Sequence, residues 1–250
     1  MRRNTSTKLP KCVAVFGACG GVGRRVVDIL LQEVELLIIS DRSHGELLDL
    51  EVSIWKRAPG LKVLSIPVDL GKDSILDEMD SLIQTSEWQV LDAIYMCAGY
   101  GLLEPYEDTP LNEKLVFLRC NLISQIYLVI SARNRSPYPI QCHCISSVCG
   151  LVPGPFYTLY HVVKAGLLSQ KELGLEGRII VPHIIEGTDF FNRGEMNRMR
   201  CWVLSLLVRC HFLNTTPRVV AEALLFGTMP YCGVGAFLCR LYAALTHWSR

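Results

Sequence analysis

Short apolar runs alternate with helix-length segments through the first two-thirds of the chain. The near-continuous apolar runs cover residues 12–16, 35–40, 61–68, 91–97 and 140–146. The segments between them, which have the length and spacing of helices, cover residues 22–32, 44–57, 74–85, 111–133 and 156–173. Strands of a parallel sheet are covered by helices on both faces and therefore read as such runs. The alternation predicts the α/β class, with a doubly wound, mostly parallel sheet of the Rossmann type.

The chain has the length of a single domain. Its 250 residues, half of them apolar, can bury one substantial core. We expect residues 1–10 to form an N-terminal extension and residues 11–190 to form a dinucleotide-binding and catalytic domain. Within it, 178–185 reads as a sixth strand despite Pro182. Residues 191–250 are expected to form a helical, apolar C-terminal segment of the same domain that covers the substrate.

The C-terminal segment combines arginines with a long uncharged stretch. A threonine before Pro217 predicts the start of a helix, and residues 223–239 then carry no charged side chain. That stretch is short for a membrane span and is interrupted by glycines and Pro230. Packing against the domain, or a shallow peripheral contact with a membrane aided by the arginines, fits it better than a crossing.

Charge and cysteine content narrow the class of protein further. Lys and Arg number 25 against 24 acidic residues, so the basic excess typical of nucleic-acid binders is missing. Eleven cysteines are scattered through apolar segments, and the polar N-terminus does not read as a signal peptide. We expect free buried thiols in the cytoplasm rather than disulfides. On a strand Cys142 and Cys144 would share one face with His143 opposite, which does not suit a zinc site.

A glycine-rich turn follows the first predicted strand. Gly17, Gly21 and Gly23 have the spacing G-x-x-x-G-x-G and stand before a helix. Only residues without a Cβ let the backbone approach a pyrophosphate closely, and the N-terminus of the helix attracts the anion. In the first βα unit of a parallel sheet this turn predicts a dinucleotide site. Its expected residues are Gly17, Cys19, Gly20, Gly21, Val22 and Gly23.

Asp41 directly follows the second predicted strand. A carboxylate there can accept hydrogen bonds from the adenosine ribose and would repel a 2′-phosphate, which favours NAD over NADP. Its neighbour Arg42 could still bind that phosphate, so NADP stays open as an alternative. The plainer alternative is that Asp41 is an ordinary surface aspartate.

A serine, a tyrosine and a lysine recur at a suggestive spacing. Ser147 ends the fifth predicted strand, Tyr160 follows thirteen residues later, and Lys164 stands four residues beyond it on the next helix. Tyr160 and Lys164 would share one helix face. An ammonium beside a phenol favours the phenolate, which makes the tyrosine a workable acid or base near neutral pH. The alternative is an amphipathic helix with the tyrosine buried and the lysine outside.

Together the glycine spacing, the strand order and S-x12-Y-x3-K resemble the short-chain dehydrogenase/reductase family over about residues 10–190. The resemblance implies that Ser147, Tyr160 and Lys164 are catalytic and that Asn121 helps to hold a proton-relay water. It also implies cofactor contacts beyond the glycine turn, from Asp41, Arg42, Asp69, Leu70, Cys97, Ala98, Gly99, Tyr160, Lys164 and Thr188.

The chain departs from the family pattern in two of these places. The family's Asn-Ala-Gly after the fourth strand is here Cys97-Ala98-Gly99, which affects the stability of the sheet more than the chemistry. The Pro-Gly and threonine expected after the sixth strand are displaced. Only its place after that strand assigns Thr188 the role of contacting the nicotinamide carboxamide.

The resemblance implies an oxidoreductase that moves hydride between NAD, or NADP, and an alcohol or ketone. Apolar residues in the segments that shape the substrate site favour a hydrophobic substrate, similar to a steroid, a retinoid or another lipid alcohol. Family members often pair through their two long helices, here 111–133 and 156–173, so a homodimer or homotetramer is expected. Two alternatives stay open: a non-catalytic NAD(H)-binding regulatory or scaffold protein, and an epimerase or dehydratase acting on a nucleotide sugar.

Overall fold

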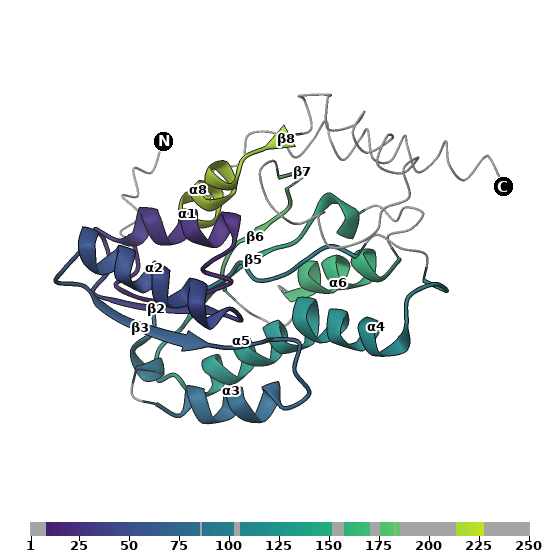
Figure 1. Cartoon of the computed structure of the whole chain (residues 1–250), viewed down its shortest axis with the longest axis horizontal. Helices are drawn as coiled ribbons and strands as arrows, with labels where there is room; N and C mark the ends of the chain where they lie inside the picture. The colour runs from purple at the N-terminus through teal and green to yellow at the C-terminus, as the bar shows by residue number, and fades with distance from the viewer. Residues whose placement is uncertain are drawn as a thin grey trace.

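Six parallel strands form the central sheet, in the order β3-β2-β1-β4-β5-β6 (Figure 1). They are β1 (Cys12–Phe16), β2 (Leu36–Asp41), β3 (Lys62–Pro67), β4 (Ala93–Met96), β5 (Gln141–Ile145) and β6 (Ile179–Ile180). The computed structural model describes residues 9–85, 87–102, 106–151, 158–170, 176–182, 184–185 and 214–227. The predicted doubly wound parallel sheet is confirmed. The strand order reverses between β1 and β4, and that reversal is where ligands of such sheets bind.

Helices cover both faces of the sheet because its strands alternate apolar side chains between the two sides. On β1, Val13 and Val15 point into one core and Ala14 and Phe16 into the other. The first core is closed by α1 (Gly21–Leu30), α2 (His44–Arg57) and α8 (Pro217–Phe226). The second is closed by α3 (Ile75–Ile83), α5 (Ser124–Arg135) and the end of α6 (Thr158–Leu168). α4 (Leu111–Leu118) is joined to α5 by the π-helix η2 (Arg119–Ile123) and lies beside α6 (Figure 1).

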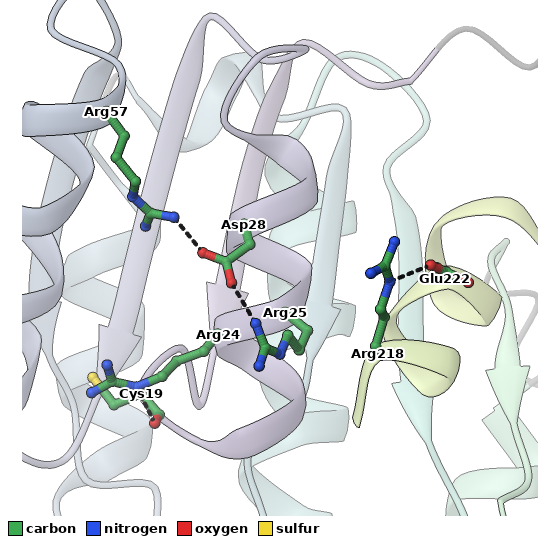
Figure 2. Close-up of polar contacts among 7 residues, drawn as sticks. All are labelled: Cys19, Arg24, Arg25, Asp28, Arg57, Arg218 and Glu222. Atoms are coloured by element: carbon green, nitrogen blue, oxygen red, sulfur yellow. Dashed lines mark hydrogen bonds and ion pairs between the residues drawn. The ribbon is translucent and has the colours of Figure 1, made fainter. Parts of the chain in front are cut away.

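Polar contacts link α1 to α2 on the first face and cap α8. Asp28 on α1 forms ion pairs with Arg57 of α2 at 2.6 Å and with Arg25 of its own helix at 3.3 Å (Figure 2). Thr216 caps α8 by accepting a hydrogen bond from the backbone N–H of Val219, so the helix predicted around Pro217 is present.

The single sixth strand predicted over 178–185 is wrong. β6 pairs with β5 for only two residues, and Ile184–Ile185 forms a separate strand, β7, which pairs with β8 (Asn214–Thr215) in a second small sheet. Pro182 stands between the two strands and has no N–H to donate to a ladder. Its carbonyl still accepts from the N–H of Val148 at 3.1 Å, so the chain after β6 stays beside the segment that follows β5.

Candidate active site

The predicted site residues gather at the carboxyl edge of the sheet. Gly17 directly follows β1, Asp41 ends β2, Cys97 directly follows β4, and Ser147 lies two residues beyond β5. Because parallel strands all end at the same edge, these residues lie around the crevice between β1 and β4. The fold alone therefore brings together residues up to 130 positions apart in the sequence.

Two glycines of the turn between β1 and α1 have no room for a side chain. Gly17 has φ +75°, and a Cβ there would lie 2.5 Å from the backbone nitrogen of Ala98. A Cβ on Gly23 would overlap the carbonyl oxygen of Gly17. The turn is thus packed tightly against the loop after β4 and against the first turn of α1. The predicted cofactor residues Gly17, Cys19, Gly20, Gly21, Val22 and Gly23 all lie in this turn or at the start of α1.

The N-terminus of α1 suits a negatively charged group. Its N-cap is Gly20, which has no side chain to occupy the first N–H groups, and the first turn of the helix carries no acidic residue. These N–H groups and the positive end of the helix dipole therefore remain for an anion such as a pyrophosphate. The bare glycine turn and the free helix end fit a dinucleotide.

Asp41 is tied to the glycine turn. Its Oδ2 accepts from the backbone N–H of Cys19 at 3.0 Å, and its Oδ1 accepts from the N–H groups of Arg42 and Ser43 at 2.8 and 3.4 Å. The carbonyl of Cys19 accepts from Nε of Arg24 at 2.9 Å (Figure 2). A carboxylate offers about four acceptor positions, so one position on Oδ2 remains for a ribose hydroxyl. The guanidinium-bearing side chain of Arg42 is exposed.

The loop after β3 is held by the helix that carries Asn121. Asp69 accepts from the N–H of Gly71 at 2.9 Å, which closes the loop on itself. Ser124 donates its hydroxyl to the carbonyl of Leu70 at 2.9 Å, and Arg119 donates to the carbonyl of Gly71 at 2.7 Å. The predicted cofactor contacts Asp69 and Leu70 therefore lie in a loop whose shape depends on η2 and α5.

The loop after β4 is fastened by two buried amides. Asn121 accepts from the N–H of Tyr100 at 3.1 Å, and Gln125 donates to the carbonyl of Ala98 at 2.9 Å. Gly99 has φ +149°, and a Cβ there would lie 2.8 Å from Oδ1 of Asn121. Cys97 occupies the place of the family's asparagine and donates its backbone N–H to Phe16. The loop is thus anchored without that asparagine.

The amides of Asn121 and Gln125 also donate to backbone carbonyls of α4 and of the π-helix η2. A π turn shifts the backbone ladder and leaves carbonyls to be satisfied by other donors. Asn121 donates to the carbonyl of Phe117 at 3.1 Å, and Gln125 donates to that of Cys120 at 3.1 Å. Since Tyr100 takes one acceptor position of Asn121 Oδ1, one position remains there for a water. The predicted relay role of Asn121 stays a prediction.

Ser147 begins a short 3₁₀ helix, η3 (Val148–Gly150), at the end of β5. Its hydroxyl oxygen accepts from the N–H of Cys149 at 3.2 Å and caps that helix. The side chain is 4% exposed. The accepted bond fixes the oxygen while leaving the hydroxyl hydrogen to be donated elsewhere.

Tyr160 and Lys164 lie one turn apart on α6, both facing inward. They are 7% and 4% exposed. The amine of Lys164 lies 5.6 Å from the centroid of the Tyr160 ring, within the range of a cation–π contact, and donates to the carbonyl of Ile145 at 2.8 Å. Burial lowers the pKa of Lys164 to about 8, so at pH 7 most molecules still carry the charge. The alternative of an outward-facing lysine is therefore wrong.

Some predicted residues lie outside the described part of the chain. Thr188 is one of them, and so are most residues of the apolar substrate lining, although Leu151 is described and is exposed. Most of the expected C-terminal segment, 191–250, and of the stretch 223–239 also lies outside.

Sequence reasoning missed several residues that shape the site. Arg119, Ser124 and Gln125 hold the loops after β3 and β4, and Gly150 packs against the backbone of α6, where a Cβ would lie 2.7 Å from the carbonyl carbon of Lys164. The spacing of Gln125, four residues after Asn121, was a usable signal because it places both on one helix face. Arg119 and Ser124 bind backbone carbonyls, and such contacts cannot be read from the sequence.

In the described part of the chain, none of the seven cysteines forms a disulfide. Burial raises the pKa of Cys19, Cys97, Cys142 and Cys144 to about 12, so these thiols stay protonated and react slowly. Within the same described residues, no three His, Cys, Asp or Glu side chains gather in a way that could hold a metal ion.

One described helix, Leu111–Arg135, is long and apolar enough to cross a membrane by length and composition alone. It contains α4, η2 and α5, and its residues Leu128, Val129 and Ala132 pack into the second core. Packing against the sheet accounts for this part of its apolar character.

Comparisons with known proteins agree on the type of fold. A short-chain dehydrogenase of Sphingobium yanoikuyae in complex with NADPH superposes with a TM-score of 0.73 at 17% identity, covering 96% of this chain and 94% of that one. A short chain dehydrogenase/reductase of Burkholderia phymatum in complex with NAD gives 0.70 at 17% identity, covering 86% and 84%. At such identities the likeness concerns the fold, which is the Rossmann-type fold that the sequence predicts.

The sequence comparisons identify the family. A curated relative, an uncharacterized short-chain type dehydrogenase/reductase of Sinorhizobium fredii, is 22% identical over 160 residues. The match covers 64% of this chain and 28% of that relative, so the chain spans less than a third of its length. The model of the family described as short chain dehydrogenase matches residues 11–174. The chain belongs to the short-chain dehydrogenase family.

Proposed function

We propose that the chain is an NAD(P)-dependent oxidoreductase that transfers hydride between a nicotinamide and an alcohol or ketone. The observation that carries this proposal is the buried amine of Lys164, 5.6 Å from the ring of Tyr160. It bonds to the end of β5, two residues before Ser147. A buried cation beside a phenol, bonded to the strand end that precedes Ser147, suits proton transfer at an edge of the sheet that also carries a glycine turn. Family membership and the dinucleotide-bound relatives support the same conclusion.

The cofactor would be held by the glycine turn, the N-terminus of α1 and the loops after β2, β3 and β4. We propose NAD as the preferred form. One acceptor position of Asp41 is left for a ribose hydroxyl, and its carboxylate would repel a 2′-phosphate. Exposed Arg42 keeps NADP as the alternative. When bound, the nicotinamide supplies or accepts the hydride.

The side chains of the site handle the proton and the substrate oxygen. Tyr160 exchanges a proton with that oxygen through its hydroxyl, and the Lys164 ammonium stabilises the phenolate that results. Ser147 donates its hydroxyl hydrogen to the same oxygen and stabilises the charge that develops there. Asn121 keeps the helix in its π-turn and offers one acceptor to a water beside the site.

The substrate class follows from the sequence. The segments that follow β5 and β6 are rich in Leu, Phe, Met and Trp, and we propose a hydrophobic alcohol or ketone on that ground. A non-catalytic NAD(H)-binding role is the less favoured alternative. The cysteine at position 97, where the family has an asparagine, favours this alternative mildly, but Asn121 and Gln125 bind the loop after β4.

The test begins with cofactor binding and then measures turnover. NADH and NADPH are titrated separately against the purified full chain by fluorescence, and an alcohol and ketone panel is screened with the cofactor that binds more tightly. We expect tighter binding of NADH and turnover of apolar members of the panel. Replacement Tyr160→Phe should lower kcat by about 10²- to 10⁴-fold.

Tyr138→Phe is the matched control, since Tyr138 is exposed and lies in the loop before β5, at the edge of the parallel sheet opposite the carboxyl edge that carries the site. Wild-type turnover in Tyr160→Phe would refute the role given to this tyrosine. Tight NADH binding without turnover of any panel member would instead favour the non-catalytic alternative.

A further inference from the structure

The segment after β5 is fastened to α6 at several successive residues. The carbonyl of Ile145 accepts from the amine of Lys164 at 2.8 Å, and the hydroxyl of Ser146 donates to the carbonyl of Lys164 at 2.7 Å. Gly150 lies so close to the backbone of Lys164 that no Cβ would fit. These contacts fix the segment at residues 145–146 and at Gly150, and Cys149 lies between Ser147 and Gly150.

His161 contacts the segment at Cys149. Its Nδ1 lies 2.6 Å from the carbonyl oxygen of Cys149. A carbonyl can only accept, so Nδ1 carries the proton, and it does so whether or not Nε2 is also protonated. The side chain is half-buried and stands on the same turn of α6 as Tyr160 and Lys164.

Cys149 is therefore held at both of its backbone groups. Its N–H donates to the hydroxyl oxygen of Ser147 at 3.2 Å, and its carbonyl accepts from His161. Since the N–H of Cys149 occupies one acceptor position of Ser147, the place of Cys149 decides where the remaining hydroxyl hydrogen of Ser147 can point. A chain of two hydrogen bonds thus links α6 to the serine.

We propose that His161 is a positioning residue for Ser147 and acts through Cys149. The proposal rests on the proposed function, because the direction of the Ser147 hydroxyl matters only if it binds the substrate oxygen. One turn of α6 then carries Tyr160 as the acid/base, Lys164 as the cation beside it, and His161 as the residue that positions Ser147. The three side chains therefore keep a fixed geometry relative to one another. His161 itself does not touch the reacting atoms.

An isosteric pair of variants tests the hydrogen bond. Asn and Leu have nearly the same shape, but only the amide of His161→Asn can donate from about the position of Nδ1. We expect His161→Leu to lower kcat by about 10- to 100-fold, as small misplacements of reacting groups do. Cofactor affinity and the KM for the substrate should change by less than about threefold, and His161→Asn should restore kcat to within about threefold of the wild type.

A double-mutant cycle separates positioning from general destabilisation. If His161 acts through Ser147, then adding His161→Leu to Ser147→Ala should cause no further loss of kcat. Losses that multiply in the double variant would overturn the proposal, and so would failure of His161→Asn to restore turnover.

A readout without turnover keeps this test independent of the proposed function. Hydrogen exchange of the amides in residues 147–151 should be faster in His161→Leu than in the wild type, and His161→Asn should keep the slow rate. Unchanged exchange in His161→Leu would show that His161 does not hold Cys149 in place. Faster exchange in a protein that binds NADH but turns over no member of the panel would uphold the contact of His161 with Cys149 and favour the non-catalytic alternative.

Discussion

Two buried bases show how the surroundings of a single side chain decide its use. Burial lowers the pKa of Lys164 to about 8 and that of His143 to about 3. Lys164 keeps its charge at neutral pH and lies beside Tyr160 at the edge of the sheet. His143 is neutral, its ring stacks on Tyr95 at 4.8 Å, and its Nδ1 accepts from the N–H of Arg178. Lys164 can therefore take part in chemistry. His143 is a packed core residue, and protonating its ring lowers the free energy of unfolding.

His143 should make the protein sensitive to mild acid. Its pKa is lower in the folded chain than the ordinary 6.5, so below pH 6.5 the unfolded chain binds more protons. The free energy of unfolding therefore falls as pH drops from about 6.5 toward 3, by about 1.4 kcal/mol per pH unit. Between pH 7 and pH 5 the wild type should lose about 2 kcal/mol more than His143→Phe, which keeps a ring against Tyr95. Urea unfolding at both pH values measures the difference.

His44→Gln provides the control, because it removes an exposed imidazole at the start of α2 instead of a buried one. The difference between wild type and variant cancels the titration of all other groups. An equal loss of stability in His143→Phe and the wild type would show that His143 is not the source.

At the scale of elements, the strands and helices were predicted where the apolar pattern is strong. The runs that became β1 to β5 and the segments that became α1 to α3 agree with the structure to within a few residues. The π-helix inside the helix predicted over 111–133 could not be read from periodicity, because one extra residue in a turn barely changes the apolar pattern. The split of the sixth strand at Pro182 could have been predicted, since a residue without an N–H interrupts a ladder.

The glycine turn between β1 and α1 gives a prediction at the same scale. A Cβ on Gly23 would overlap the carbonyl of Gly17, which is rigid backbone. Gly23→Ala must therefore push α1 away from the turn, and we expect it to cost about 1–3 kcal/mol of unfolding free energy. NADH affinity should fall as well, because the N-terminus of α1 moves from its place beside the turn. Thermal melts and NADH titration measure the two effects.

Gly45→Ala is the matched control. Gly45 lies in the first turn of α2, where nothing stands within 4 Å of an added Cβ, so alanine should be neutral or slightly stabilising. If Gly23→Ala bound NADH as tightly as Gly45→Ala does, the close packing of the turn would not be needed for the cofactor.

At the scale of the whole molecule, apolar side chains remain on the outer surface of α4, η2 and α6. Leu111, Leu115, Val116 and Ile123 are exposed on the first two elements, and Val162 is exposed on α6. α4 and α6 lie side by side (Figure 1), so these side chains belong to one side of the molecule. An exposed apolar surface of this kind is typical of an interface, and the helices are those through which we expect two copies to pair.

Replacing Leu115 by glutamate should break that pairing. A charge at the centre of an apolar interface loses its water without gaining a partner, which costs several kcal/mol. Leu115, 47% exposed on α4, and Leu48, 45% exposed on α2, form a matched pair because the second lies on the other face of the sheet. Light scattering after gel filtration should show a dimer or tetramer for the wild type and for Leu48→Glu, and a monomer for Leu115→Glu. Dissociation caused by Leu48→Glu alone would place the interface on another surface. A monomeric wild type would show that the two copies do not pair. Because both substitutions add the same charge at similar exposure, only the position of the helix can separate their effects.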